Sequence, residues 1–157
     1  MDAAAFVIRE ATLTDIPEML RQRRAMYQDM GQRDASLLDG MVRSSTSYLH
    51  EAMTSGSLRA WLAEIGAGEI AGGGVVILSP WLSRPHSLQC RQAFILNVYT
   101  YPQYRRQGVA RRVMLTMIRW CRDQGFAYVS LHASPDGKAL YESLGFEPTS
   151  EMRLKLR

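Results

Sequence analysis

A short basic turn with a single glycine carries the strongest chemical signal in this sequence. Residues 105–110 read Arg-Arg-Gln-Gly-Val-Ala and stand between a β-rich run and a strongly periodic helical stretch. Small residues at Gly108 and Ala110 let backbone amides approach a ligand, and a helix N-terminus adds unpaired N–H groups and positive potential. The turn is therefore a candidate pyrophosphate site. A purely structural basic turn is the alternative, because neither a GxGxxG pattern nor a phosphate-loop lysine is present.

Positive charge gathers around this turn. The formal net charge of the chain is only +4, yet six arginines precede the single acid of the segment, Asp123, namely Arg105, Arg106, Arg111, Arg112, Arg119 and Arg122. Such a field is typical of a solvated helix face, or of a site for an anionic cofactor or a nucleic acid. Nucleic-acid binding would call for interleaved aromatic residues, and this stretch offers only Trp120. We therefore expect no nucleic-acid partner.

Other chemistries find less support in the residue pattern. A hydrolase is disfavoured because the sequence has no GxSxG motif and no plausible Ser, His, Asp set. His50 and His86 have no second ligand at a useful spacing, so we expect no metal. Cys90 and Cys121 lack CxxC spacing, which favours reduced thiols. The run of glycines at 72–74 has no GK[ST] after it and predicts a bulge or a close backbone approach.

The length of 157 residues predicts one domain spanning residues 1–157. An apolar share of 46% and a charged share of 22% match globular averages, and no apolar run approaches the roughly 20 residues that cross a bilayer, so we expect no membrane partner. The first residues lack the basic start and apolar stretch of a signal peptide, which makes a cytoplasmic protein the default expectation.

The hydrophobic periodicity predicts the elements that must position the basic turn. In the first half of the chain we expect a strand at 6–9, helices at 16–30 and 37–53, and a hairpin of strands at 58–65 and 70–78 around residues 66–68. A long exposed loop at 79–91 and a strand at 93–100 follow, and then a helix from 107 to a stop at Gly125. The last expected elements are a strand at 128–133, a short helix capped by Ser134 and ended by Gly145, and a final strand at 152–156.

Two segments together resemble a known family. The strand and turn at 95–110 resemble the strand and [RQ]xxGx[GA] loop of the GNAT superfamily of acyl-CoA-dependent N-acetyltransferases, and Ala-Leu-Tyr-Glu-Ser-Leu-Gly-Phe at 139–146 resembles its final helix and GF step. The resemblance is specific over 94–147 and topological before that. It implies an α/β, single-domain GNAT fold, with a central mixed, mostly antiparallel sheet of six or seven strands flanked by about four helices.

The same resemblance implies acetyl-CoA as the acyl donor and assigns residues to it. The backbone of Val98, Tyr99 and Thr100 would pair with the pantetheine amides, and Ser134 stands where many relatives carry an asparagine that contacts this arm. The implied pyrophosphate loop comprises Arg105, Arg106, Gln107, Gly108, Val109, Ala110 and Arg111. Tyr141 matches the tyrosine that in many relatives protonates the departing thiolate; an aromatic side chain packing a helix onto the sheet is its structural alternative.

The base and the acceptor are less visible. Many relatives use a glutamate on one of the two central strands, but 93–100 and 128–133 contain no carboxylate. His132, or a water chain ordered by Asn97 or Tyr99, is a candidate base, and Asn97 and His132 are also candidate substrate residues; structural roles compete with each.

The implied reaction is acetyl transfer to a primary amine, with a small molecule favoured over a protein N-terminus as the acceptor. We expect the acceptor near residues 30–34 and 79–91. A catalytically degenerate acyl-CoA sensor is the alternative function, motivated by the missing carboxylate and by Ser134. A homodimer is left open.

Overall fold

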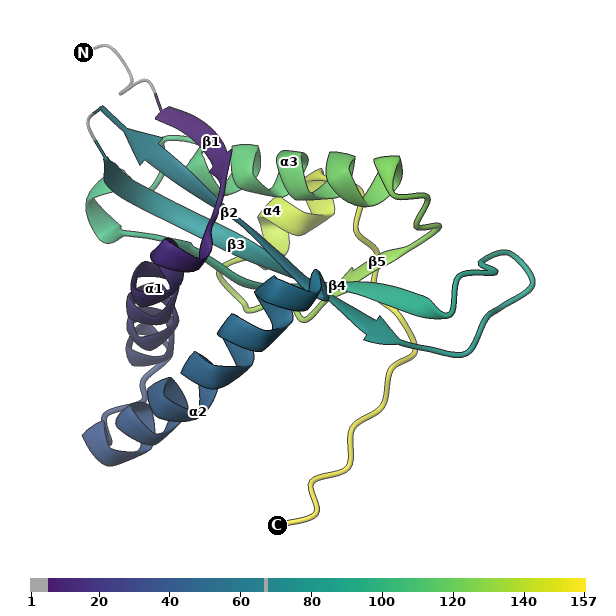
Figure 1. The fold of residues 1–157 in the computed structure, drawn as a ribbon, viewed down its shortest axis with the longest axis horizontal. Coiled ribbons are helices and arrows are strands. Elements are labelled where there is room, and N and C mark those ends of the chain that lie inside the picture. Colours follow the sequence, from purple (N-terminus) through teal and green to yellow (C-terminus); the bar gives the residue numbers. More distant parts are fainter. Residues whose placement is uncertain (1–5, 67) are drawn as a thin grey trace.

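The computed structural model describes residues 6–66 and 68–157, and its centre is a five-stranded sheet. The strands are β1 (Phe6–Glu10), β2 (Leu58–Ile65), β3 (Glu69–Pro80), β4 (Arg91–Thr100) and β5 (Val129–Leu131), and they lie side by side in chain order. The first three pairings are antiparallel, whereas β4 and β5 run parallel (Figure 1). The predicted mixed, mostly antiparallel sheet is confirmed.

Helices cover both faces of the sheet. α1 (Ile16–Asp29) and α2 (Ala35–Ser55) lie on one face, and α3 (Val109–Asp123) and α4 (Lys138–Ser143) lie on the other (Figure 1). Two single-turn 3₁₀ helices, η1 (Leu13–Asp15) and η2 (Pro102–Tyr104), precede α1 and follow β4. The expected four helices are confirmed, and the layered arrangement buries one stripe of each long helix.

Two apolar clusters fix these layers. On one face Val113, Met114 and Met117 of α3 are fully buried against the sheet, while the arginines of that helix point to solvent. On the other face Ile16 and Met19 of α1 pack with β2 and β3. The apolar spacing seen in the sequence therefore sets which side of α3 meets the sheet.

Local chemistry explains where the long helices begin and end. Asp34 caps α2 by accepting hydrogen bonds from the amides of Ser36 and Leu37 at 2.9 and 3.2 Å, and Gly56 ends it with a left-handed φ of 76°. Thr12 precedes η1, where its backbone amide donates a hydrogen bond to Oδ2 of Asp15 at 2.7 Å.

The glycines at 72–74 are sites of close approach, as predicted. A Cβ on Gly72 would lie 2.3 Å from the carbonyl oxygen of Tyr99 on β4, and one on Gly74 would lie 2.7 Å from Cε of Met117 on α3. Both neighbours occupy the space that a side chain would need. These glycines therefore let β4 and α3 pack directly onto the backbone of β3.

The structure corrects several expected boundaries. The final strand predicted at 152–156 does not form; this segment is extended but unpaired, so the sheet has five strands rather than six or seven. β5 is shorter than the expected 128–133, because only residues 129–131 find partners on β4. Strands β3 and β4 reach into the expected loop at 79–91 and reduce it to 81–90.

Two expectations concern residues outside the ranges that the structure describes. The missing signal peptide was inferred from the first residues of the chain, and residues 1–5 lie outside the described ranges. In the hairpin turn, Gly66 and Gly68 have left-handed φ values of 54° and 98°, while Ala67 between them lies outside those ranges.

Candidate acetyl-CoA site

Strand β4 is bulged at its centre. Val75 of β3 faces Leu96, and Gly73 faces Tyr99, so β4 contains one more residue than β3 across this interval. Asn97 takes up the extra residue with a left-handed φ of 57°, which is strained for a residue other than glycine. Backbone strain of this kind is typical of functional sites, where it redirects a carbonyl or an amide.

The bulge coincides with the place where β4 and β5 part. Their parallel pairing covers only Ala93 to Ile95 on β4. Within the described residues, the end of β4 from 96 to 100 has no strand partner on the β5 side. Val98 packs toward the α3 face of the sheet, and the backbone beyond the bulge is available to an extended ligand in the manner of an added strand.

Two buried polar atoms at this opening have no partner in the described structure. They are Oδ1 of Asn97 and Oγ1 of Thr100. Buried polar atoms are normally hydrogen-bonded, and an exception calls for a missing ligand or water. Both atoms belong to the opening where the cofactor's amide-bearing arm was predicted, so the residues present fit such a group.

The basic turn follows β4 and η2 and leads into α3. Gly108 precedes the helix with a left-handed φ of 80°, Arg106 has a φ of 64°, and no side chain caps the helix. The first amides of a 15-residue helix therefore keep free N–H groups. Residues 105–110 thus form a cationic turn whose backbone donors can hold a doubly charged phosphate group.

Arg105 is committed to a structural contact that the sequence did not reveal. Its Nε donates to the carbonyl oxygen of Thr100 at 3.0 Å, and its guanidinium forms an ion pair with Asp29 at the end of α1. It also lies over the ring of Tyr99, 5.7 Å from the centroid. Arg105 therefore ties the turn to α1, and no sequence spacing links it to Asp29.

Other residues of the turn brace it. Gln107 donates from Nε2 to the carbonyl oxygen of Gln103 at 3.1 Å, and Arg111 donates from NH1 to Oγ of Ser143 on α4 at 2.9 Å. The side chain of Arg106 is exposed. Arg106 is thus the arginine of this turn with the greatest freedom to meet an anion.

Tyr141 lies on α4, on the same face of the sheet as α3. Its ring packs against the apolar cluster of that face, with Phe146 edge-on at a centroid distance of 6.0 Å. Gly137 allows this position, because a Cβ there would lie 2.7 Å from Cε2 of Tyr141. Burial raises the pKa of the Tyr141 phenol above its ordinary value of 10.0, which keeps it protonated near neutral pH.

Ser134 stands at the exit of β5 but does not cap α4. Its hydroxyl oxygen accepts from the amide of Gly137 at 3.2 Å and closes the turn 135–137, so the helix starts at Lys138 instead of Pro135. The hydroxyl is engaged locally, and its reach toward a ligand is shorter than that of an asparagine.

His132 faces away from Tyr141. Val129 and Leu131 pack on the α3 side, and His132 instead meets Phe94 edge-on at 4.9 Å. Its Nε2 lies 2.9 Å from Oε1 of Glu151. The two predicted substrate residues are therefore separated in role: Asn97 belongs to the opening between β4 and β5, and His132 to the C-terminal segment.

The two segments expected near the acceptor lie toward opposite ends of β4. Asp29, next to residues 30–34, contacts Arg105 directly. The connection 81–90 joins the opposite end of β4, about 20 Å from Asn97 at roughly 3.3 Å per residue. It also projects beyond the rest of the fold (Figure 1).

Alternative chemistries find no constellation in the structure. Across residues 6–66 and 68–157, no group of three or more His, Cys, Asp or Glu side chains gathers at metal-binding distance. No described helix combines the length and apolarity needed to span a membrane. Cys121 is buried, which raises its pKa to about 11, and Cys90 is exposed.

The bulged β4, its separation from β5 and the uncapped start of α3 all lie within the part of the chain that matches a known family. Residues 22–146 match the model of the acetyltransferase (GNAT) family, and the chain belongs to this family. The predicted resemblance is confirmed.

Solved structures agree over nearly the whole chain. A GCN5-related N-acetyltransferase from Ralstonia eutropha JMP134 aligns with a TM-score of 0.88 and 28% identity, covering 97% of this chain and 99% of that one. A predicted acetyltransferase with acetyl-CoA from Clostridium acetobutylicum aligns with a TM-score of 0.85 and 23% identity, covering 98% and 96%. At 23% identity, the similarity to the second structure shows a shared fold only.

Curated relatives match over shorter stretches. Human N-acetyltransferase 8 is 29% identical over 121 residues, which are 75% of this chain and 49% of that protein. The mouse probable N-acetyltransferase family 8 member 5 is 35% identical over 96 residues, which are 58% and 39%. The matched stretch thus spans less than half the length of these curated relatives.

Proposed function

We propose that this chain transfers an acetyl group from acetyl-CoA to a primary amine of a small molecule. One observation carries the proposal: the opening between β4 and β5 holds two orphaned polar atoms, on Asn97 and Thr100, and continues into the free amides of α3. An extended, amide-bearing ligand with a pyrophosphate at one end satisfies both features.

The residues assigned to acetyl-CoA form two groups, one for each chemical part of the molecule. The backbone of Val98 to Thr100 offers strand-like hydrogen bonds, and the amides of Val109 to Arg111, with Arg106, hold the negative end. When bound, acetyl-CoA supplies a thioester carbonyl for attack and a thiolate that leaves. The bulge at Asn97 redirects backbone groups at the point where donors to the developing oxyanion are needed.

Tyr141 is our proposed general acid. Its raised pKa keeps the phenol neutral, so the proton is held at Oη until negative charge forms on the sulfur. Packing against Gly137 and Phe146 fixes the ring, and a fixed donor is more effective than a mobile one. The amine proton passes to solvent in this scheme, because β4 and β5 carry no acidic residue beside Asn97 and His132 is engaged by Glu151.

A small acceptor is favoured by the kinds of protein that share the fold. A glucosamine-6-phosphate N-acetyltransferase from Arabidopsis thaliana aligns with a TM-score of 0.69 and 22% identity, and an aminoglycoside N-acetyltransferase aligns with a TM-score of 0.73 and 17% identity. Both proteins are named for amine-bearing small molecules. We therefore place such amines first in a screen.

An acyl-CoA sensor is the second candidate. The observations that favour it are the absence of a carboxylate on β4 and β5 and the local engagement of the Ser134 hydroxyl. A sensor would bind acetyl-CoA without turnover. Release of free thiol with any amine of the screen excludes it.

The decisive experiment measures thiol release with Tyr141→Phe. The ring and its packing remain, and only the proton donor is lost, so we expect kcat to fall by about 10²- to 10⁴-fold with unchanged acetyl-CoA affinity. Tyr128→Phe, which alters an exposed tyrosine, is the matched control and should act as wild type. A fall of Tyr141→Phe below about fivefold would leave Tyr141 a packing residue and water the acid.

A further inference from the structure

The connection between β3 and β4 is an ordered hairpin that projects from the fold. The amide of Trp81 donates to the carbonyl oxygen of Cys90 at 2.9 Å, and Arg84 and Ser87 exchange backbone hydrogen bonds of 2.8 and 2.9 Å. Residues 81–90 therefore continue the two strands up to a tight turn, and we call them the projecting hairpin. Figure 1 shows this hairpin extending past the end of α3. At roughly 3.3 Å per residue, its turn lies about 13 Å beyond the end of β3.

Large apolar side chains are exposed on the projecting hairpin. Leu82 and Leu88 are 87% and 79% exposed, and Trp81 is 48% exposed. Trp81 and Leu82 lie on the arm that continues β3, and Leu88 lies on the arm that returns to β4. Single exposed apolar residues are normal on a protein surface, but a group of them on one short projection marks a site of interaction.

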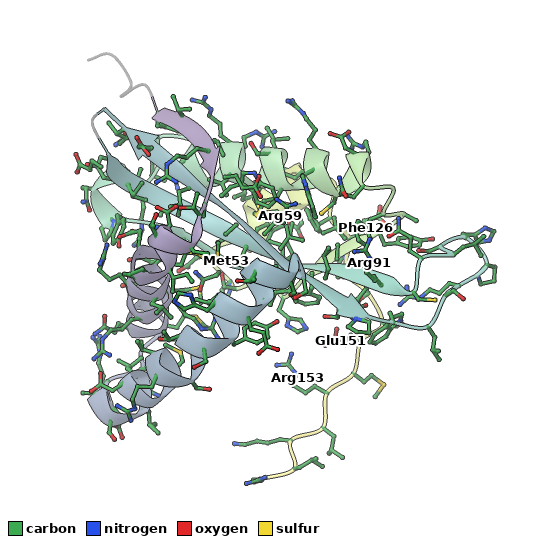
Figure 2. All side chains as sticks on the ribbon, viewed as in Figure 1. Met53, Arg59, Arg91, Phe126, Glu151 and Arg153 are labelled. Atoms are coloured by element: carbon green, nitrogen blue, oxygen red, sulfur yellow. The ribbon has the colours of Figure 1, made fainter. Side chains whose placement is uncertain are left out.

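The sequence around the projecting hairpin carries only positive charge. Residues 70–122 contain eight arginines and no aspartate or glutamate. Arg84 of the hairpin lies over the ring of Trp81 at 5.8 Å, and Arg91 at its base lies over the ring of Phe126 at 5.5 Å. Figure 2 shows Arg91 and Phe126 close together there. The hairpin therefore presents apolar side chains and positive charge with no acidic residue in its own sequence.

The base of the projecting hairpin is fixed to the end of α3. Gln89 donates from Nε2 to the carbonyl oxygen of Gln124, directly after that helix, at 2.9 Å. Arg119 and Arg122 on the last turns of α3 are exposed and outnumber the neighbouring Asp123. The contact at Gln124 therefore holds the hairpin in a fixed direction and brings the basic end of α3 near its base.

The shape of this region favours a lipid bilayer over a protein as its partner. Protein interfaces are anchored by side chains that fill preformed pockets. The hollow at the base of the hairpin, lined by residues that include Trp81, Gln89 and Tyr128, measures about 30 Å³ and admits only a water-sized group. A fluid bilayer needs no pocket, because its lipids rearrange around an inserted side chain.

We propose that the projecting hairpin docks this protein on an anionic lipid bilayer. Leu82 and Leu88 enter the boundary between headgroups and acyl chains, and Trp81 lies at the interface, where its ring is buried and its N–H remains hydrated. Arg84 and Arg91 meet the acidic headgroups. The hairpin's reach of about 13 Å exceeds the roughly 5–10 Å depth of such contacts.

A contact of this depth needs no spanning segment. The sequence-based expectation of no membrane partner rests on the absence of a long apolar run, and that absence concerns spanning, not surface contact. The turn at 105–110 follows the opposite end of β4, so docking through the hairpin leaves the proposed donor site in water.

The test is co-sedimentation with sucrose-loaded vesicles. Wild-type protein should bind vesicles of equal parts phosphatidylglycerol and phosphatidylcholine, bind phosphatidylcholine alone much less, and lose binding as salt is raised. Leu82→Ser with Leu88→Ser should lower the partition coefficient for the mixed vesicles by at least about tenfold, because two apolar side chains no longer leave water. Leu13→Ser with Leu37→Ser, which changes two leucines exposed elsewhere, is the matched control and should bind as wild type.

Two further variants separate charge from insertion. Arg84→Gln should weaken binding to the mixed vesicles by about fivefold, whereas Arg43→Gln, at an exposed arginine of α2, should not. Trp81→Phe should remove most of the blue shift of tryptophan emission that the vesicles cause, because Trp61 is buried and Trp120 packs against it. Circular dichroism checks that every variant is folded.

Several outcomes would overturn the proposal. Wild-type protein that stays in the supernatant, equal binding to the neutral vesicles, or binding that survives the Leu82 and Leu88 substitutions would each do so. Light scattering without lipid tests a second copy as the partner. A wild-type dimer that the same two substitutions convert to a folded monomer would show that the hairpin joins two chains, and would also overturn docking on a bilayer.

Discussion

Replacing Gly137 with alanine should slow catalysis by moving Tyr141. Gly137 has an ordinary φ of −87°, so alanine causes no backbone strain there. The added Cβ would lie 2.7 Å from Cε2 and 3.1 Å from Oη of Tyr141. Gly137→Ala is therefore a steric perturbation aimed at one side chain.

The contact distances set the size of the effect. An ordinary contact begins near 3.4 Å, so the ring must retreat by about 0.7 Å from its packed position. A misplacement of about 1 Å at a reacting group can cost about 10²-fold, and we expect kcat to fall by about tenfold to a hundredfold. Acetyl-CoA affinity should hold, because the three heavy atoms nearest to the new methyl group all belong to Tyr141.

A double-mutant cycle with Tyr141→Phe makes the reasoning specific. Once the hydroxyl is gone there is no donor to misplace, so Gly137→Ala should change kcat by less than about twofold in that background. Gly40→Ala is the matched control: it lies within α2, where a Cβ meets only Arg43 at 4.0 Å, and it should leave kcat unchanged.

Two results would refute this account. If Gly137→Ala lowers kcat equally in the wild-type and Tyr141→Phe backgrounds, it acts through something other than the phenol. The second result is a Gly137→Ala variant with wild-type kcat whose crystal structure shows the Tyr141 ring displaced by about 0.7 Å from its wild-type position. The position of Tyr141 would then not matter for proton transfer.

Three further changes test the rest of the site. Gly108→Glu should abolish the rise in Tm that acetyl-CoA causes. Gly56→Glu, at a similar left-handed φ with open space around it, is the control and should keep this rise. If both variants lose the rise equally, backbone strain explains the effect. Gly72→Ala should lower the unfolding free energy by about 1–3 kcal/mol in urea, since its Cβ would strike the backbone of β4, and a neutral result would mean that β4 can shift. The guanidinium of Arg9 donates hydrogen bonds to Asp15 and lowers the pKa of this carboxyl group from the ordinary 3.8 to about 2. The ionised Asp15 therefore stabilises the folded state fully above pH 3.8, and this contribution disappears as the pH falls through 2. Asp15→Asn should cost about 1 kcal/mol at neutral pH and flatten that acid limb, and an unchanged limb would assign acid unfolding to other groups.

Much of the site follows from local sequence. Gly108 and Ala110 predict an accessible turn before α3, and the arginines and apolar residues of 109–123 predict which face of the helix is solvated, because both properties depend on neighbours within one or two turns. The two family segments at 95–110 and 139–146 lie where the resemblance places them, at the β4–α3 turn and on α4.

Contacts between distant segments could not be predicted in this way. The ion pair of Arg105 with Asp29 joins residues 76 positions apart, and the space for the Tyr141 ring depends on where Gly137 stands in a turn. His132 carries no sequence signal that it faces Glu151 rather than Asn97. Each depends on how the elements pack, which a periodicity within one element does not contain.

The final strand marks the boundary between the two kinds of information. Alternation at 152–156 determines that the segment is suited to a sheet, because side chains of an extended chain point to opposite sides at every step. The alternation does not identify the strand with which the segment would pair, since pairing needs a strand edge at the right place and in the right direction. Only the tertiary structure decides that this segment does not pair with β5, because the position of Glu151 against His132 sets the direction in which the chain continues.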